Sequence, residues 1–210
     1  MLFAAESIPQ LFAADAWVLR GRATSSAERL ITDLERIASV SPWRRVVTPG
    51  GKPMSVDMTN CGACGWVSDR RGYRYENSDP VTEAPWPAMP ESFRTLAIGA
   101  AHEAGFAHFD PDACLVNRYV PGAKMALHQD RDERDMSQPI VSVSLGLPIT
   151  FMFGGPMRSD PTTKVTLEHG DVVVWGASSR LFFHGVGTLR SGLHPLTGAS
   201  RINLTFRRAL

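Results

Sequence analysis

The stretch that decides the fold is Arg201-Ile202-Asn203-Leu204-Thr205-Phe206-Arg207, in which polar and apolar residues alternate without a break. Successive side chains of a β-strand point to opposite faces, so this stretch predicts a strand with one apolar and one polar face. The apolar face consists of Ile202, Leu204 and Phe206. The polar face consists of Arg201, Asn203, Thr205 and Arg207. Such a polar face is usually solvated, but an arginine at each end could also clamp a small molecule that carries two carboxylates.

A second pattern, earlier in the chain, has the spacing of metal ligands. His128 and Asp130 are two positions apart, so in an extended segment both side chains point the same way while Gln129 points elsewhere. With His184 as a distant third ligand, they form the set of two histidines and one carboxylate that holds Fe(II) and leaves positions open. The short pattern alone is common by chance, and the same ligands can hold Zn(II). The ligand pattern, combined with the strand 201–207 and its two arginines, predicts an iron enzyme that uses 2-oxoglutarate.

The residues after Gly105 predict a mainly β core. Short runs of β-branched and aromatic residues are separated there by Gly, Pro and Asp turns, a pattern typical of an antiparallel sandwich or barrel. The expected strands are 113–119, 141–145, 150–153, 164–167, 171–175, 180–184 and 201–206. A double-sheet jelly roll, or double-stranded β-helix, with helices outside one sheet fits this order. The expected fold class is therefore α+β, mainly β.

Two helices and a long irregular segment precede this core. The first helix is expected over 26–39, with Ser25 and Glu28 as a capping box, and the second is expected from Pro90 to Gly105. The segment 41–87 is rich in Gly, Pro, aromatic and charged residues, as binding loops and lids are. We expect hairpins with flexible connections there, as a lid on a core at about 110–207. One domain is the default for 210 residues.

The window from Trp43 to Tyr75 combines basic and aromatic side chains. It contains six basic residues against two acidic ones, together with four large aromatic residues. Basic groups can meet phosphates and aromatic faces can stack on bases, so the window indicates a surface for single-stranded nucleic acid. A solvated basic loop with a few anchoring aromatic residues has the same composition.

Composition and cysteine usage exclude several classes of protein. Apolar residues make up 43% and charged residues 20%, as in a globular protein, and no stretch is long and apolar enough to span a membrane. The first residues lack the basic start and apolar run of a secretory signal, so we expect a cytoplasmic protein without a membrane partner. Cys61, Cys64 and Cys114 are an odd number, which argues against a disulfide framework. The C-x-x-C pair lacks further ligands for a zinc site, so we interpret the cysteines as incidental.

Nine ordered blocks between about Asp15 and Phe206 make the chain resemble a known family. The blocks are Met58–Gly62, Gly65–Trp66, Trp86–Pro90, Asn117–Tyr119, Pro121–Lys124, Leu127–Asp130, Pro139–Pro148, His169–Trp175 and Arg201–Arg207. Together they resemble the AlkB family of Fe(II)- and 2-oxoglutarate-dependent nucleic-acid demethylases. The resemblance implies a jelly-roll core with an amino-terminal nucleotide-recognition lid. It also implies Fe(II), with 2-oxoglutarate and dioxygen as co-substrates.

The resemblance also implies roles for individual residues. The implied iron ligands and catalytic residues are His128, Asp130 and His184. The residues implied to bind 2-oxoglutarate are Asn117, Tyr119, Arg201, Asn203, Thr205 and Arg207. The residues implied to bind the substrate are Met58, Trp66, Tyr73, Tyr75, Lys124, Gln129, Asp132, Glu133 and Arg158. Trp66 would stack on the damaged base against His128, and Asp132 would accept a hydrogen bond from the exocyclic amine of the base.

The activity implied by the resemblance is repair of alkylated DNA. The enzyme would demethylate 1-methyladenine and 3-methylcytosine in single-stranded DNA and release formaldehyde, succinate and carbon dioxide. Because these lesions are cationic, nearby carboxylates make electrostatic sense. RNA, double-stranded DNA and a protein side chain are alternative substrates of the same fold, and a monomer is expected. A zinc hydrolase and a non-catalytic metal-binding jelly roll are alternatives from other classes, although a simple metal binder needs no dicarboxylate clamp.

Overall fold

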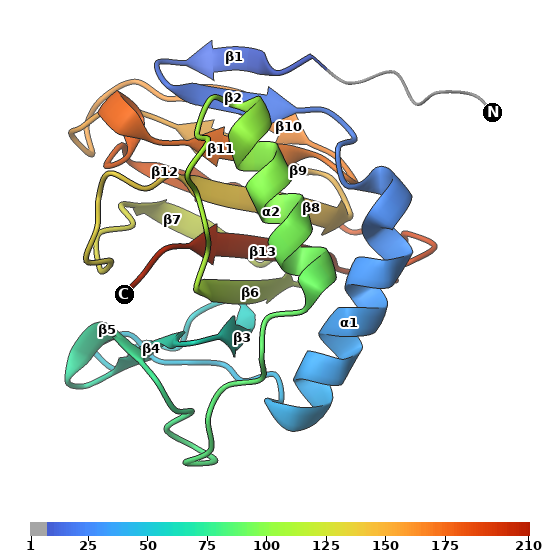
Figure 1. The fold of residues 1–210 in the computed structure, drawn as a ribbon, viewed down its shortest axis with the longest axis vertical. Coiled ribbons are helices and arrows are strands. Elements are labelled where there is room, and N and C mark those ends of the chain that lie inside the picture. The colour runs from blue at the N-terminus through green and yellow to red at the C-terminus, as the bar shows by residue number, and fades with distance from the viewer. Residues whose placement is uncertain (1–7) are drawn as a thin grey trace.

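Two antiparallel sheets packed face to face form the body of the molecule (Figure 1), which we describe for residues 8–210 in a computed structural model. The larger sheet has the order β1-β2-β11-β8-β13-β6-β3, with bounds Gln10–Ala13, Ala16–Leu19, Val172–Trp175, Ile140–Gly146, Arg201–Arg207, Ala113–Tyr119 and Asp57–Gly62. The smaller sheet has the order β10-β9-β12-β7, with bounds Thr163–Leu167, Ile149–Phe153, His184–Val186 and Met125–His128. Two sheets in this arrangement confirm the predicted jelly-roll core.

Each strand of the larger sheet divides its side chains between two cores. On β13, Ile202, Leu204 and Phe206 face the core that α1 (Ala27–Val40) and α2 (Glu91–Glu103) cover from outside. On β11, Val172 and Val174 face this outer core, whereas Val173 and Trp175 face a second core between the two sheets. Both helices lie on one face of the larger sheet (Figure 1), so its other face is left to the smaller sheet and the cavity between them.

The two helices lie where the sequence predicts them, but the first begins differently. Ser26 occupies the N-cap position of α1 without a side-chain cap bond, and its hydroxyl donates to the Ala23 carbonyl. The predicted Ser25–Glu28 capping box is therefore wrong, because a short 3-10 turn (Thr24–Ser26) leads directly into the helix. Helix α2 begins just after Pro90 and ends before Gly105, as expected. No helix within residues 8–210 has the length and apolar character needed to cross a membrane.

The strand prediction succeeds for β6, β8, β9, β10, β11 and β13 and fails at residues 180–184. There the chain forms a 3-10 turn (Ala177–Ser179) followed by further turn bonds, including Phe182 N–H to the Ser179 carbonyl, and β12 starts only at His184. The apolar run before His184 suggested a strand, but the buried Arg180 side chain holds the chain in this turn. Strands β1, β2 and β7 were not predicted.

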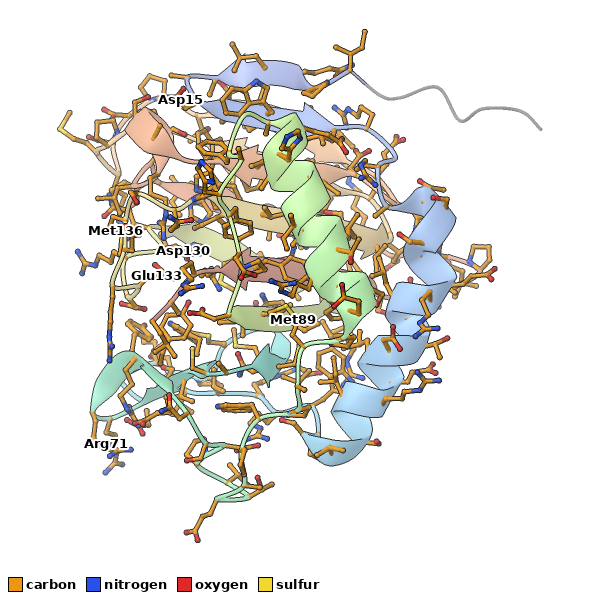
Figure 2. The ribbon with its side chains drawn as sticks, in the orientation of Figure 1. Asp15, Arg71, Met89, Asp130, Glu133 and Met136 are labelled. Carbon is orange, nitrogen blue, oxygen red and sulfur yellow. The ribbon has the colours of Figure 1, made fainter. Side chains whose placement is uncertain are left out.

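The segment 41–87 is only partly a separate cover. Its strand β3 pairs along its whole length with β6 and forms one edge of the larger sheet. Strands β4 (Gly65–Asp69) and β5 (Gly72–Glu76) form a hairpin of their own below that edge (Figure 1). Figure 2 shows Arg71 at the outer tip of this hairpin, and Asp130 and Glu133 in the body of the molecule beyond it. We call β4 and β5 with their turn the recognition hairpin.

Candidate active site

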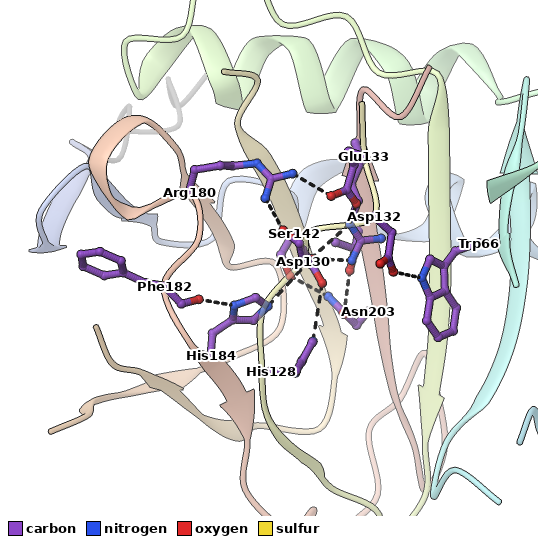
Figure 3. Close-up of polar contacts among 12 residues, drawn as sticks. Trp66, His128, Asp130, Asp132, Glu133, Ser142, Arg180, Phe182, His184 and Asn203 are labelled. Carbon is purple, nitrogen blue, oxygen red and sulfur yellow. Dashed lines mark hydrogen bonds and ion pairs between the residues drawn. The ribbon is translucent and has the colours of Figure 1, made fainter. Parts of the chain in front are cut away.

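Two strands of the smaller sheet bring the three expected metal ligands together. His128 ends β7 and is the direct cross-strand partner of His184, the first residue of β12. Asp130 follows two residues after β7, with its carboxylate oxygens 3.6 Å from His128 Nε2 and 3.8 Å from His184 Nε2. One donor atom from each residue lies within 4.8 Å of the others (Figure 3). This spacing fits a single ion held by two imidazoles and one carboxylate.

The hydrogen bonds of both histidines leave the same ring nitrogen free. His128 Nδ1 lies 2.9 Å from the Ala126 carbonyl and His184 Nδ1 lies 3.0 Å from the Phe182 carbonyl. A carbonyl only accepts, so each Nδ1 carries the proton and each Nε2 keeps its lone pair. Backbone carbonyls fix metal-binding histidines in this way. Burial, together with His128, lowers the pKa of His184 to about 4, which keeps the ring neutral as a ligand must be.

The carboxylate of Asp130 is held ionised by its surroundings. Burial alone would raise its pKa, but Arg207, His184 and His128 together outweigh burial and hold the pKa below its ordinary value. Arg207 contributes most, because its Nη2 donates to Asp130 Oδ2 at 2.6 Å and its Nε donates to the same oxygen at 3.1 Å. The donor set therefore matches Fe(II) in charge as well as in geometry.

The two arginines of β13 lie in different electrostatic surroundings. Arg207 forms ion pairs with two carboxylates, whereas Arg201 is only 1% exposed and pairs with no carboxylate of residues 8–210. Arg201 Nη2 donates to Ser144 Oγ at 2.8 Å, and the guanidinium lies 5.0 Å from the centre of the Tyr119 ring. Its Nε and Nη1 have no hydrogen-bond partner in the described chain. A buried cation with two unused donors fits an incoming carboxylate.

The residues between the two arginines form a fixed polar surface. Asn203 donates to Ser142 Oγ at 2.8 Å and to the Val143 carbonyl at 3.0 Å, while Thr205 donates to Asn203 Oδ1 at 3.0 Å. Asn117, on the neighbouring strand β6, has a buried carboxamide oxygen that finds no hydrogen-bond partner among residues 8–210. The polar face of β13 is therefore buried rather than solvated, and a small dicarboxylate such as 2-oxoglutarate fits it.

A cavity of about 510 Å³ between the two sheets connects the metal ligands with β13 and the recognition hairpin. Phe151 and Trp175 form part of its apolar wall. The expected residues that line it are Met58, Trp66, Tyr73, Asn117, Tyr119, His128, Gln129, Asp130, Asp132, Glu133, Arg158, His184, Arg201, Asn203, Thr205 and Arg207. Two expected substrate residues do not line it. Tyr75, on β5, donates its hydroxyl proton to Glu133, and Lys124 is exposed on a loop.

Trp66 stands at the side of this cavity in a fixed orientation. Its indole Nε1 donates to Asp132 Oδ2 at 2.8 Å (Figure 3). Its ring stacks on Tyr73 with centroids 5.3 Å apart and planes inclined by 16°. Across the mouth, the Arg158 guanidinium lies 4.8 Å from the centre of the Phe183 ring and donates to the Leu127 carbonyl. Gln129 donates to the Leu181 carbonyl at 2.6 Å.

Sequence reasoning missed Arg180, Ser142 and Ser144. Arg180 is 3% exposed and donates to Glu133, so a buried arginine supports the loop that carries Asp130. A lone arginine in an apolar run carries no signal of such a role. The two serines did carry one, because they alternate with apolar residues on β8 and hold Asn203 and Arg201 from the same face.

The three cysteines are free, fully buried thiols, in keeping with an incidental role. Burial, with Asp112 nearby, raises the pKa of Cys64 to about 12, and burial raises the pKa of Cys114 well above its ordinary value. Because only a thiolate reacts readily, we expect iodoacetamide at pH 8 to label the folded protein slowly and the urea-unfolded protein rapidly. Mass spectrometry of both samples measures this, and fast labelling of Cys64 in the folded protein would contradict it.

Comparison with known proteins agrees with this geometry. Residues 16–207 match the model of the 2OG-Fe(II) oxygenase superfamily. The alpha-ketoglutarate-dependent dioxygenase AlkB of Escherichia coli is 58% identical over 99% of this chain and 97% of its own length. The DNA N(6)-methyladenine demethylase ALKBH1D of Arabidopsis thaliana is 35% identical over 63% of this chain and 35% of its own length.

A solved structure extends the comparison to the fold. The structure of OsALKBH1 superimposes with a TM-score of 0.82 at 28% identity, over 95% of this chain and 99% of that one. The superfamily uses Fe(II), 2-oxoglutarate and dioxygen, and the triad and the buried arginine are donors of the kinds that these groups require. The chain belongs to the AlkB family of Fe(II)- and 2-oxoglutarate-dependent dioxygenases.

Proposed function

We propose that this chain repairs DNA by oxidative demethylation of 1-methyladenine and 3-methylcytosine in single strands. The observation that carries the proposal is that one cavity holds a metal triad, an unpaired buried arginine and a stacking aromatic residue. The likeness to proteins named as dioxygenases and as a DNA demethylase supports it. We also propose that the enzyme acts as a monomer in the cytoplasm.

The metal triad and the polar residues of β13 have distinct tasks in this proposal. His128, Asp130 and His184 would hold Fe(II) through Nε2, a carboxylate oxygen and Nε2. Arg201 would bind one carboxylate of 2-oxoglutarate with its two unused donors, together with Tyr119 and Asn117. Arg207 would hold Asp130 in place and present positive charge to the other carboxylate. Asn203 and Thr205 would form the polar floor beneath the co-substrate.

The methylated base would enter between Trp66 and His128. A base reaches such a slot only after it leaves the stack, and the apolar wall with Met58 would then exclude water from it. Asp132 keeps one carboxylate oxygen outside its bond to Trp66, and that oxygen can accept from the exocyclic amine of the base. Tyr73, Gln129 and Arg158 would line the path of the strand, and Lys124 would reach a phosphate from its exposed loop.

The chemistry that Fe(II) and 2-oxoglutarate would supply when bound uses dioxygen as the oxidant: one oxygen atom enters succinate as carbon dioxide is lost, and the other hydroxylates the N-methyl carbon. The C–N bond of the resulting N-hydroxymethyl group would then break, with its electron pair staying on the ring nitrogen and the hydroxyl proton passing to solvent, so that formaldehyde leaves and the neutral base is restored. The residues that line the cavity would position the methyl group beside the metal triad and exclude solvent from it.

Ion pairs reduce the number of basic residues in the window from Trp43 to Tyr75 that remain free to bind phosphates. Arg44 pairs with Asp79, Arg45 with Asp57, and Arg74 with Asp69 and Glu76. Within residues 8–210, Lys52 and Arg70 of that window form no ion pair, and Arg71 is exposed beside Asp69 at the hairpin tip. We infer that phosphate binding depends on these three residues with Arg158 and Lys124.

One assay tests the function as a whole. Protein with Fe(II), 2-oxoglutarate and dioxygen is given methylated single-stranded DNA, and formaldehyde and succinate are measured in parallel. Equal amounts of both products support the proposal. Faster turnover with methylated RNA or duplex DNA would reassign the substrate. Succinate without formaldehyde on every nucleic acid would move the chain to another substrate, including a protein side chain.

Loss of the stacking aromatic residue should separate repair from co-substrate turnover. Base–aromatic stacking is worth about 1–3 kcal/mol, so Trp66→Ala should lower repair of a methylated oligonucleotide by roughly five- to a hundredfold. Trp66 does not touch the metal ligands, so succinate formation without DNA should continue. Product formation by wild type, Trp66→Ala and Trp66→Phe measures this, since the phenyl ring keeps part of the stacking. Equal repair by all three proteins would remove Trp66 from the site.

A further inference from the structure

Glu133 is the centre of a buried hydrogen-bond cluster that joins three parts of the chain. Its side chain is 2% exposed, and both carboxylate oxygens have partners. Tyr75 donates to Oε1 at 2.7 Å, Arg207 Nε lies 3.2 Å from the same oxygen, and Arg180 Nη2 donates to Oε2 at 2.9 Å. Both oxygens of the Glu133 carboxylate are therefore engaged within the protein, whereas the neighbouring Asp132 is exposed to solvent.

Arg180 connects this cluster to the metal-binding loop. Its Nη1 donates to the main-chain carbonyl of Asp130 at 2.7 Å, and its Nε donates to the Gln138 carbonyl at 2.8 Å. One planar guanidinium therefore holds the backbone of Asp130, the end of its loop and Glu133 in one arrangement (Figure 3). Such a fork is rigid, because its donors lie in one plane.

Tyr75 connects the same cluster to the recognition hairpin. It lies on β5 directly opposite Trp66 of β4, so the position of Tyr75 also sets that of Trp66. The loop after Asp130 holds the hairpin at two adjacent residues, since Asp132 accepts from Trp66 and Glu133 accepts from Tyr75. A movement of the hairpin therefore acts on the loop that carries Asp130.

We propose that Glu133 is a positioning residue that couples the recognition hairpin to Asp130 and Arg207. Order in the hairpin then favours binding of metal and 2-oxoglutarate, and their binding favours order in the hairpin, because coupling between two sites is reciprocal. The inference rests on the proposed roles of Asp130 and Arg207. It assigns Tyr75 to the same link, in place of a direct contact with nucleic acid.

The test uses the full chain loaded with Mn(II) and no nucleic acid. 2-Oxoglutarate is titrated calorimetrically into wild type, Tyr75→Phe and Glu133→Gln. Tyr75→Phe keeps the ring and removes one hydroxyl outside the cavity, so a purely structural role would leave the dissociation constant unchanged. We expect the constant to rise about five- to tenfold, the lower part of the usual range for coupled sites. Glu133→Gln should raise it further, because two arginines lose their charged partner.

Hydrogen exchange of residues 65–76 supplies a second readout. Addition of Mn(II) and 2-oxoglutarate should slow the hydrogen exchange of this segment in wild type. In Tyr75→Phe the same addition should change the exchange rate much less. Asp33→Asn is the matched control, since Asp33 is a buried carboxylate paired with Arg29 and Arg36 on α1. It should lower the melting temperature and leave the dissociation constant unchanged.

The outcomes distinguish the link from the proposed function. A folded Tyr75→Phe protein would overturn the coupling if it binds 2-oxoglutarate as tightly as wild type and its hydrogen exchange slows as much on ligand addition. The metal and co-substrate assignments would then still stand. Equal weakening by Asp33→Asn and Tyr75→Phe would show a general loss of stability and would also overturn the link. Failure of wild type to bind 2-oxoglutarate with Mn(II) would overturn the proposed function itself.

Discussion

Replacement of His128 by alanine is expected to abolish 2-oxoglutarate turnover in a protein that stays folded. The side chain is 40% exposed and its removal leaves no buried charge without a partner, so stability should change little. Loss of groups that only support a ligand already costs about 10- to 100-fold in activity or metal affinity, so loss of the ligand itself should exceed that. Succinate formation measures the loss of turnover, and metal analysis after gel filtration measures the loss of bound iron.

A matched control is available on the opposite face of the larger sheet. His102 is an exposed histidine on α2, and His102→Ala should keep wild-type turnover and iron content. Asp130→Ala is a less clean test, because Asp130 also neutralises Arg207, and breaking a buried pair costs about 3–5 kcal/mol. Near-full turnover by His128→Ala would show that the triad is assigned wrongly.

Arg201→Met should weaken 2-oxoglutarate binding by roughly ten- to a hundredfold without a loss of stability. The affinity change corresponds to charge-assisted bonds worth about 1.5–3 kcal/mol. Stability should hold or rise, because within residues 8–210 the buried guanidinium has no carboxylate partner and its Nε and Nη1 make no hydrogen bond, a costly state for a cation. Calorimetric titration of Mn(II)-loaded protein measures the first effect, and urea unfolding of the metal-free protein measures the second.

Arg207→Met is the contrasting variant on the same strand. Arg207 neutralises Asp130 and contacts Glu133, so its removal leaves two buried carboxylates short of a partner. We expect both affinity and stability to fall, the latter by about 3–5 kcal/mol. A destabilised Arg201→Met protein with normal affinity would mean that Arg201 is a structural residue.

Local periodicity explains what could be predicted from the sequence. The alternation in 201–207 assigned both faces of β13, and the same rule placed His128 and Asp130 on one side. These predictions needed only the geometry of one strand. The partners of that strand, its central place in the sheet and the burial of its polar face depend on residues far away in the chain.

The failures share a physical cause in long-range contacts. Strands β1 and β2 contain four residues each, and β2 lies in the sheet because it pairs with β11, more than 150 residues later. The resemblance placed Glu133 among the substrate residues, and its buried contacts could not be predicted, since its partners Tyr75, Arg180 and Arg207 come from three separate segments. A strand pattern in 180–184 concealed the turn that Arg180 stabilises.

The central position of β13 has a consequence for synthesis of the chain. Strands β8 and β6 both pair with β13, and both are translated before it. A nascent chain therefore cannot close the larger sheet until Arg207 has left the ribosome, and until then it exposes two long apolar strand edges, which favour aggregation. A chain whose translation stops before Arg201 would carry the metal triad but neither arginine that we propose to bind 2-oxoglutarate, so we expect it to be prone to aggregation as well as inactive.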